Sequence, residues 1–293
     1  MKLSDASSVS LVGPSYNIYR FTDQIYKIVH FPNPRNQIVT EKAEKVSTGE
    51  KLDATFSRAR RVVLELALCN PWKYFCTFTL DPKKYDRYSL DKWYKSFTQW
   101  IRDQRKKYNC DISYLLIPEM HKDGAWHMHG MFSDVPGLIP FSKLLSDGMN
   151  VPISLAEKGF LCWIPYFKKY GYCSFGQIKS PVAAGFYITK YMEKSFEDSQ
   201  LPVGAHLYYA SHGLNRAEKH GEIYGESDYL NTFTPYKYQY CETGMTHLDD
   251  GLSWDFALEY MAITPLSNEE DSLQSLEDDY MEVEQIEQMA INM

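Results

Sequence analysis

The chain has 293 residues, 44% hydrophobic and 15% aromatic, which is enough to bury a core in one main domain with extensions or in two domains. No window approaches ~18 uninterrupted apolar residues, and the first residues lack a basic stretch followed by an apolar run. We therefore expect no membrane segment and a cytoplasmic location. The six cysteines form no C-x-x-C pair, which argues against a zinc ribbon and a disulfide framework.

The net charge of −7 is distributed unevenly along the chain. Residues 269–293 carry nine acidic side chains and no basic one, a composition compatible with a frayed helix or with disorder. Between Arg58 and Lys194, 21 Lys/Arg stand against 12 Asp/Glu, a net charge of +9. Such an excess is typical of proteins that contact a phosphate backbone, although a basic solvated surface has the same composition.

The first half of the chain predicts one extension and three regular elements. Residues 1–48 show no sustained periodicity, and we interpret them as an N-terminal extension. Good helix formers at residues 47–68 predict a helix. The stretch KYFCTFTL at residues 73–80 is rich in aromatic and β-branched residues and predicts a strand. Apolar residues at helical spacing over residues 89–107 predict a second, amphipathic helix.

The next elements predict a hairpin and a further helix. ISYLLIPE at residues 112–119 and WHMHGMF at 126–132 indicate two antiparallel strands joined by a short turn. Pro181 then begins a helix that reaches about Phe196. This order predicts an α+β fold, a central antiparallel sheet with flanking helices packed on one face. We expect one domain over residues 49–230 and a C-terminal extension with an acidic tail over residues 231–293.

The predicted hairpin carries a candidate metal site. His127 and His129 are two apart in a strand, so both imidazoles project from the same face. Glu119 ends the preceding strand, and pairing of the two strands can bring its carboxylate beside them. Two imidazoles and one carboxylate form an open site for a divalent cation, whereas H-x-H alone is more often two ordinary strand histidines. His121 lies in the turn and ranks behind Glu119 as a ligand.

The helix after Pro181 carries a candidate nucleophile. Tyr187, Lys190, Tyr191 and Lys194 fall at i, i+3, i+4 and i+7 and share one face. A tyrosine oxygen can attack phosphorus when nearby positive charge stabilises its ionised form, and the two lysines can supply that charge. The alternative interpretation is that both tyrosines are boundary residues of an amphipathic helix.

Three motifs occur in an order that resembles a known family. These are FCTFTLD at residues 75–81, EMHKDGAWHMHG at 119–130 and YITKYMEK at 187–194. Together they resemble the rolling-circle replication initiators (Rep proteins) of the HUH endonuclease superfamily. The third motif is similar to that of the two-tyrosine initiators of small single-stranded DNA phages. A later stretch, YYASHGLNR at residues 208–216, resembles a segment that follows the third motif in phage and plasmid members.

The resemblance implies a fold, a cofactor and a reaction. The fold would be an antiparallel sheet related to the ferredoxin-like and RNA-recognition arrangements. Glu119, His127 and His129 would hold Mg²⁺ or Mn²⁺, and a tyrosine would nick single-stranded DNA, leaving a 5′-phosphotyrosine and a free 3′-hydroxyl. We expect Tyr187 to attack first, because single-tyrosine relatives keep the first Y-x-x-K unit, with Tyr191 able to alternate with it.

The resemblance also implies partners. The partner would be a single-stranded replication origin, and the residues we expect to contact DNA are Thr77, Thr79, Arg58 and Arg61. The chain contains no G-x-x-x-x-G-K-[ST] phosphate loop, so we expect no nucleoside triphosphate site and reliance on a host helicase in a bacterial cytoplasm. Two alternatives stay open: a transposase or relaxase of the same superfamily, and a non-catalytic origin-binding repressor. Relaxases usually carry three histidines, which favours an initiator here.

Overall fold

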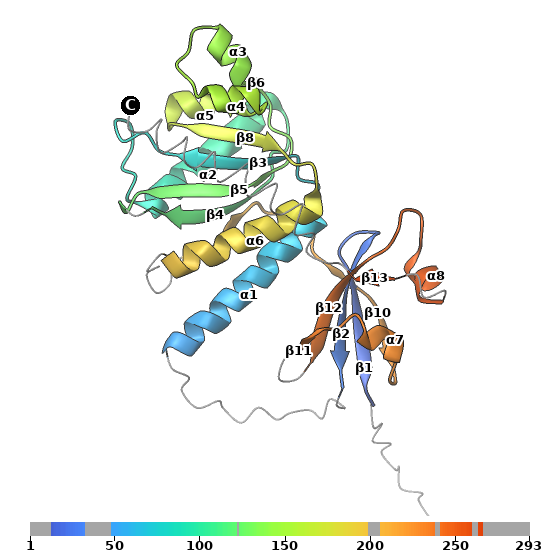
Figure 1. Cartoon of the computed structure of the whole chain (residues 1–293). Helices are drawn as coiled ribbons and strands as arrows, with labels where there is room; N and C mark the ends of the chain where they lie inside the picture. The colour runs from blue at the N-terminus through green and yellow to red at the C-terminus, as the bar shows by residue number, and fades with distance from the viewer. Residues whose placement is uncertain are drawn as a thin grey trace, which may run out of the picture. The chain divides into compact units, whose positions relative to one another are not determined.

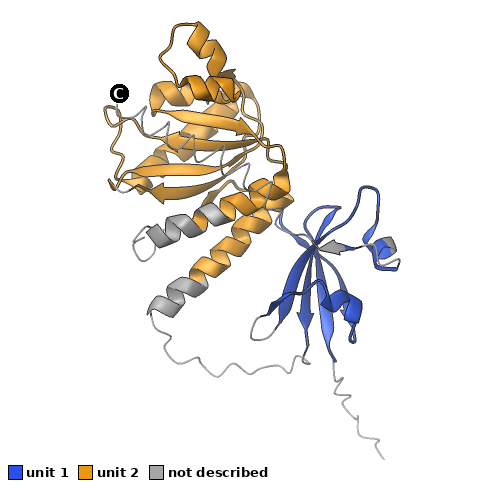
Figure 2. Cartoon of the chain, viewed as in Figure 1, with its two compact units in different colours: residues 1–47, 216–267 blue, residues 48–215, 268–293 orange. Residues whose placement is uncertain are grey.

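The computed structural model describes residues 13–32, 48–121, 123–198, 206–237, 241–259 and 263–265. Within these ranges the side chains of residues 48–54, 190–191, 193–198, 256 and 264–265 lie outside the description. The chain divides into two compact units, unit 1 with Met1–Ser47 and Arg216–Ser267, and unit 2 with Thr48–Asn215 and Asn268–Met293. Figure 2 colours the two units, and each is described by itself.

Unit 1 is built on an antiparallel sheet with the strand order β10-β1-β2-β12-β11, and β13 pairs with β12. Its core is aromatic and aliphatic, with Tyr16, Ile18, Tyr26 and Ile28 from one face of β1 and β2. Its strands are β1 (Ser15–Arg20), β2 (Ile25–Phe31), β10 (Glu218–Tyr224), β11 (Tyr236–Lys237), β12 (Glu242–His247) and β13 (Thr264–Pro265), and its helices are α7 (Asp228–Asn231) and α8 (Trp254–Glu259).

The expected division of the chain differs from this architecture. The sequence pattern predicts an extension over residues 1–48, but β1 and β2 are inner strands that pair with β10 and β12. The boundary expected at residue 230 falls inside α7 of the same unit. The partner strands lie roughly two hundred residues apart in sequence, so no local periodicity marks them as one sheet. The acidic tail expected after residue 267 lies outside the described residues.

Unit 2 contains a seven-stranded sheet with the order β6-β7-β8-β3-β5-β4-β9. Every pair in it is antiparallel, which confirms the expected α+β fold with a central antiparallel sheet (Figure 1). The strands are β3 (Tyr74–Thr79), β4 (Tyr114–Met120), β5 (Trp126–Phe132), β6 (Leu138–Pro140), β7 (Leu161–Trp163), β8 (Cys173–Gln177) and β9 (Tyr209–Ala210).

Helices cover both faces of this sheet, so the expectation of helices on one face is wrong. On one face the Phe97 ring of α2 lies 5.6 Å from that of Phe78, and on the other the Tyr187 ring of α6 lies 5.3 Å from that of Phe75. Strand β3 is buried on both faces, as its uninterrupted apolar run requires. The helices of unit 2 are α1 (Thr48–Cys69), α2 (Leu90–Tyr108), α3 (Phe141–Ser146), α4 (Ile153–Glu157), α5 (Ile164–Lys169) and α6 (Pro181–Asp198).

Among the residues described, no helix is both long enough and apolar enough to cross a membrane. Helix α6 packs on α1 as well as on the sheet, with Gly185 of α6 close to the side chain of Leu68. Helices α1 and α6 therefore belong to the same layer, and α2 belongs to the opposite one.

The register of the central strands decides which side chains meet. Thr77 and Thr79 of β3 lie opposite His129 and His127 of β5, and Glu119 of β4 lies opposite His127. Directly opposed residues share a face, so these five side chains lie on the face that α6 covers. The next residue of β5, at position 130, must be glycine. A Cβ there would come within 2.0 Å of the Leu115 carbonyl oxygen.

Candidate functional site

Two histidines stand side by side on β5, under the layer that contains α6. His127 and His129 are each 2% exposed, and their rings lie 6.5 Å apart at an interplanar angle of 10°. This is the arrangement that strand alternation predicts for residues i and i+2. Buried imidazoles need hydrogen-bond partners, so the atoms around each ring nitrogen indicate their role.

Each histidine is held by a threonine from the neighbouring strand. Thr77 Oγ1 lies 3.1 Å from His129 Nδ1, and Thr79 Oγ1 lies 3.0 Å from His127 Nδ1. The sequence predicts that these threonines contact DNA, but they are 3% and 1% exposed and bond to the imidazoles instead. A hydroxyl that accepts from Nδ1–H fixes the ring orientation and leaves the Nε2 lone pair for another partner. The matching spacing of T-x-T and H-x-H is the sequence signal for this contact.

The carboxylate of Glu119 joins the histidine pair, as expected. Its Oε2 lies 3.0 Å from His129 Nε2 and 3.5 Å from His121 Nε2. His121 belongs to the site too, because its ring stacks on that of His127 with 3.6 Å between centroids. As a turn residue, His121 is expected to rank behind Glu119. The turn is firmly held, however, since the His121 amide donates to the Ala125 carbonyl at 2.9 Å.

The environment of His127 favours its neutral form. Burial lowers its pKa well below the usual value, the charges of His121, His129 and Arg87 lower it further, and only Glu119 raises it. A neutral imidazole is the form that a metal ligand requires. In the part of the chain that the structure describes, no three His, Cys, Asp or Glu side chains are already arranged to hold a metal ion. Glu119 instead makes an ion pair with His129 at 3.0 Å.

The helix with the two tyrosines lies on the same face as the histidines, but Tyr187 is buried. It is 4% exposed and belongs to the core, where its ring meets Phe75 edge to face. This burial does not favour the expectation that Tyr187 attacks first. The side chains of Lys190, Tyr191 and Lys194 lie outside the described residues.

The direction of α6 places residue 191 closer to the histidine pair than residue 187. Strand β8 ends at Gln177 opposite Tyr74, so α6 starts at that end of β3 and runs along the sheet toward Thr79 (Figure 1). Four helical residues advance ~6 Å along the helix axis. Two strand residues advance ~7 Å, from Phe75 to Thr77, which pairs with His129. Residue 191 is therefore level with His129.

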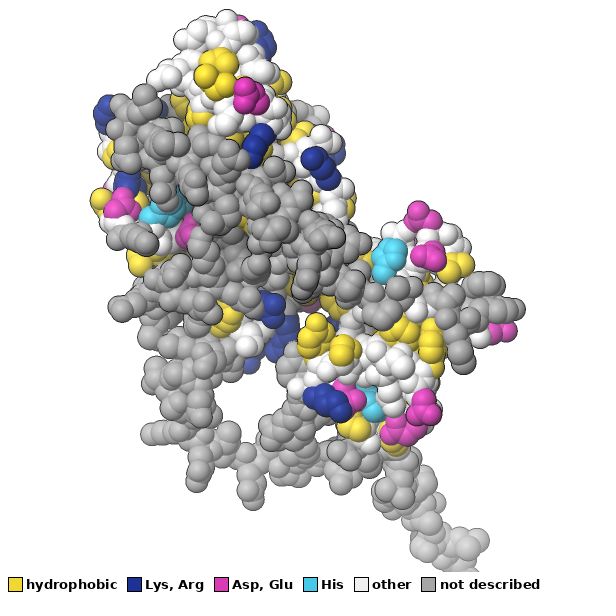
Figure 3. All heavy atoms as spheres, viewed as in Figure 1, with side chains coloured by type: hydrophobic (Ala, Val, Ile, Leu, Met, Phe, Trp, Pro, Cys, Tyr) yellow, Lys and Arg dark blue, Asp and Glu magenta, His cyan; other side chains and the backbone are white. Residues whose placement is uncertain are grey.

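Basic side chains of α1 lie on the surface of unit 2. Arg58, Arg60 and Arg61 are all exposed, and Figure 3 shows basic side chains gathered over α1. Because α1 packs beside α6, the arginines expected to contact DNA belong to the helical layer that covers the histidine face. Exposed guanidinium groups suit contacts to phosphate oxygens.

Comparison with known proteins identifies the family of this region. Residues 73–196 match the family model of the ORF2-type replication-associated protein. No curated protein and no solved structure matches the chain. The matched residues begin just before β3 and end within α6, so they include the histidine pair, Glu119 and both tyrosines. Residues 73–196 of this chain are thus a replication-associated domain of the ORF2-type family, of the kind found in rolling-circle replication initiators.

Proposed function

We propose that unit 2 is a metal-dependent endonuclease that nicks single-stranded origin DNA through a tyrosine of α6. One observation carries this proposal. Glu119, His127 and His129 project from one face of the sheet, beneath the helix that bears the two tyrosines. A phosphate bound between the sheet and α6 would meet the histidine pair on one side and a helix-borne phenol on the other.

The side chains present fit Mg²⁺ or Mn²⁺ by their chemistry. Imidazole nitrogens and a carboxylate suit such cations, and Thr77 and Thr79 orient both rings so that Nε2 is the available donor. Glu119, His127 and His129 would hold the ion, which would replace the contact between Glu119 and His129. When bound, a divalent cation polarises the phosphate and offsets the charge of the transition state.

We assign the first attack to Tyr191, because the helix direction brings residue 191 level with His129 while Tyr187 packs on Phe75. The tyrosine oxygen would form a bond to phosphorus as the bond to the 3′-oxygen breaks, and the leaving oxygen would take a proton. The phosphodiester energy is retained in the 5′-phosphotyrosine. A later 3′-hydroxyl can therefore reverse the reaction and close the strand without ATP. Lys190 and Lys194 would stabilise the ionised phenol.

The direct test is covalent capture of DNA. The full chain is incubated with Mn²⁺ and a pool of random-sequence single-stranded oligonucleotides labelled at the 3′ end. We expect a labelled adduct that survives denaturing electrophoresis, because the phosphotyrosine keeps the fragment downstream of the cut. EDTA should prevent it. DNA binding without any adduct would instead support a non-catalytic origin-binding protein.

The threonine contacts give a separate prediction about the metal. Changing Thr79 to Val removes the hydroxyl beside His127 and keeps the side-chain shape. We expect the Mn²⁺ concentration for half-maximal adduct formation to rise about tenfold or more, since lost outer hydrogen bonds typically weaken metal sites by that amount. Thr246→Val is a matched control, because Thr246 is also buried and its hydroxyl donates to the Tyr26 carbonyl in unit 1. An equal Mn²⁺ requirement in both variants would contradict the assigned role of Thr79.

A further inference from the structure

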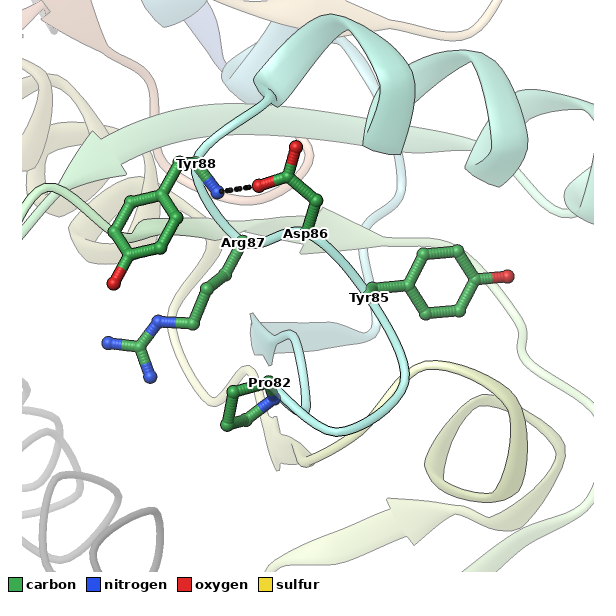
Figure 4. Close-up of a pocket in the computed structure, with 5 residues that line it drawn as sticks. All are labelled: Pro82, Tyr85, Asp86, Arg87 and Tyr88. Atoms are coloured by element: carbon green, nitrogen blue, oxygen red, sulfur yellow. Dashed lines mark hydrogen bonds between the residues drawn. The ribbon is translucent and has the colours of Figure 1, made fainter.

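The loop between β3 and α2 encloses a pocket next to the histidine pair. The pocket has a volume of about 270 Å³ and is lined by Pro82, Tyr85, Asp86, Arg87 and Tyr88 (Figure 4). The Trp126 amide donates to the Arg87 carbonyl at 2.9 Å, and Trp126 immediately precedes His127. The pocket is therefore fixed to the start of β5, one residue from the candidate site.

Arg87 brings a partly used guanidinium to this pocket. Its side chain is 14% exposed and pairs with the Asp123 carboxylate in the β4–β5 turn. Its Nε is buried and has no hydrogen-bond partner among the described residues. A guanidinium has five N–H donors, so the contact to Asp123 leaves capacity for a further acceptor. A phosphate oxygen is the acceptor that the planar guanidinium recognises best.

Tyr88 offers an aromatic face at the same place. It is 62% exposed, one of the few large hydrophobic side chains so exposed among the described residues. Gly124 of the β4–β5 turn lies against its ring: a Cβ on Gly124 would be 3.7 Å from Tyr88 Cδ1. The Arg87 guanidinium carbon lies 5.9 Å from the ring centroid. The Tyr88 amide donates to Asp86 Oδ1 at 3.0 Å, which fixes the backbone that carries the ring (Figure 4).

We propose that this pocket binds one nucleotide of single-stranded DNA beside the histidine pair, with its base stacked on Tyr88 and its phosphate bound by Arg87. An exposed aromatic ring next to a cation is the combination that single-strand-binding proteins use, because every base has a face that can stack. The inference rests on the proposed function, since it names how the same site holds its substrate. The shared turn and the backbone bond to Trp126 would keep that nucleotide in register with the histidines.

The test is a binding titration that does not depend on nicking. The full chain, in EDTA, is titrated by fluorescence anisotropy against oligothymidine and against an abasic deoxyribose-phosphate chain of the same length. We expect Tyr88→Ala to weaken oligothymidine binding about tenfold and to leave abasic binding unchanged, since a single stacked base contributes about that much. Tyr88→Trp should restore it. Arg87→Lys keeps a charge for Asp123 but loses the planar fork, so it should weaken binding of both probes.

The matched control is Tyr236→Ala, because Tyr236 is also 62% exposed and lies in unit 1. Wild-type affinity of Tyr88→Ala for oligothymidine, or an equal loss for both probes or in Tyr236→Ala, would overturn the inference. If wild type forms the covalent adduct while Tyr88→Ala binds normally, the pocket assignment fails and the proposed function stands. If Tyr88→Ala shows the base-dependent loss while wild type forms no adduct, the nuclease proposal fails alone.

Discussion

Tyr191→Phe is expected to abolish covalent capture of single-stranded DNA, reducing the labelled adduct by more than about a thousandfold, as loss of a nucleophile does in other enzymes. The reason is its place on α6. The helix runs from the Tyr74 end of β3 toward Thr79, and residue 191 lies level with His129. Adduct yield at fixed Mn²⁺, read on a denaturing gel, measures the effect.

Tyr187→Phe is the matched control for this prediction. It removes a hydroxyl from the neighbouring turn of the same helix but keeps the ring that packs on Phe75. We expect this variant to retain the adduct within about tenfold, a loss far smaller than that of a missing nucleophile. If Tyr187→Phe alone loses the adduct, Tyr187 attacks first. If both variants retain it, neither tyrosine is the nucleophile.

Sequence alone predicts the elements with strong local patterns. The helix at α1, the strand β3, the amphipathic helix α2, the β4–β5 hairpin and the helix α6 all follow from periodicity and from Pro or Asn punctuation. The hairpin prediction also places Glu119 beside the histidines, because the spacing across a short turn fixes which residues are opposed. Local pattern is sufficient wherever the partner strand is close in sequence.

The remaining features depend on contacts between distant segments. Strand β8 lies beside β3, yet the segment before Pro181 shows only turn residues and short aromatic runs, and its three-residue and five-residue strands are too short for alternation to show. Unit 1 joins β1 and β2 to β10 and β12, which no local signal links. The expected role of the threonines is wrong for the same reason, because their partners lie on another strand.

His127→Ala is expected to remove Mn²⁺-stimulated nicking, lowering adduct yield by about a hundredfold or more, because a three-ligand site loses one of its two imidazoles. Binding of single-stranded DNA in EDTA should stay within about tenfold, since His127 is 2% exposed and backbone contacts dominate affinity. Mn²⁺ affinity is measured separately, from the paramagnetic resonance signal of the free ion, so that metal loss and activity loss are read independently.

The substitution also leaves a cavity, so the fold must be controlled. His127→Gln fills most of the space and keeps a polar atom toward Thr79, whose hydroxyl lies 3.0 Å from the native ring. His247→Ala changes a partly exposed histidine of unit 1 and should leave both Mn²⁺ affinity and adduct formation unchanged. If His127→Ala and His127→Gln fold normally and still nick DNA in a chelator-sensitive way at wild-type Mn²⁺ concentrations, His127 is not a ligand. The Thr79 contact would then serve only the packing of the sheet.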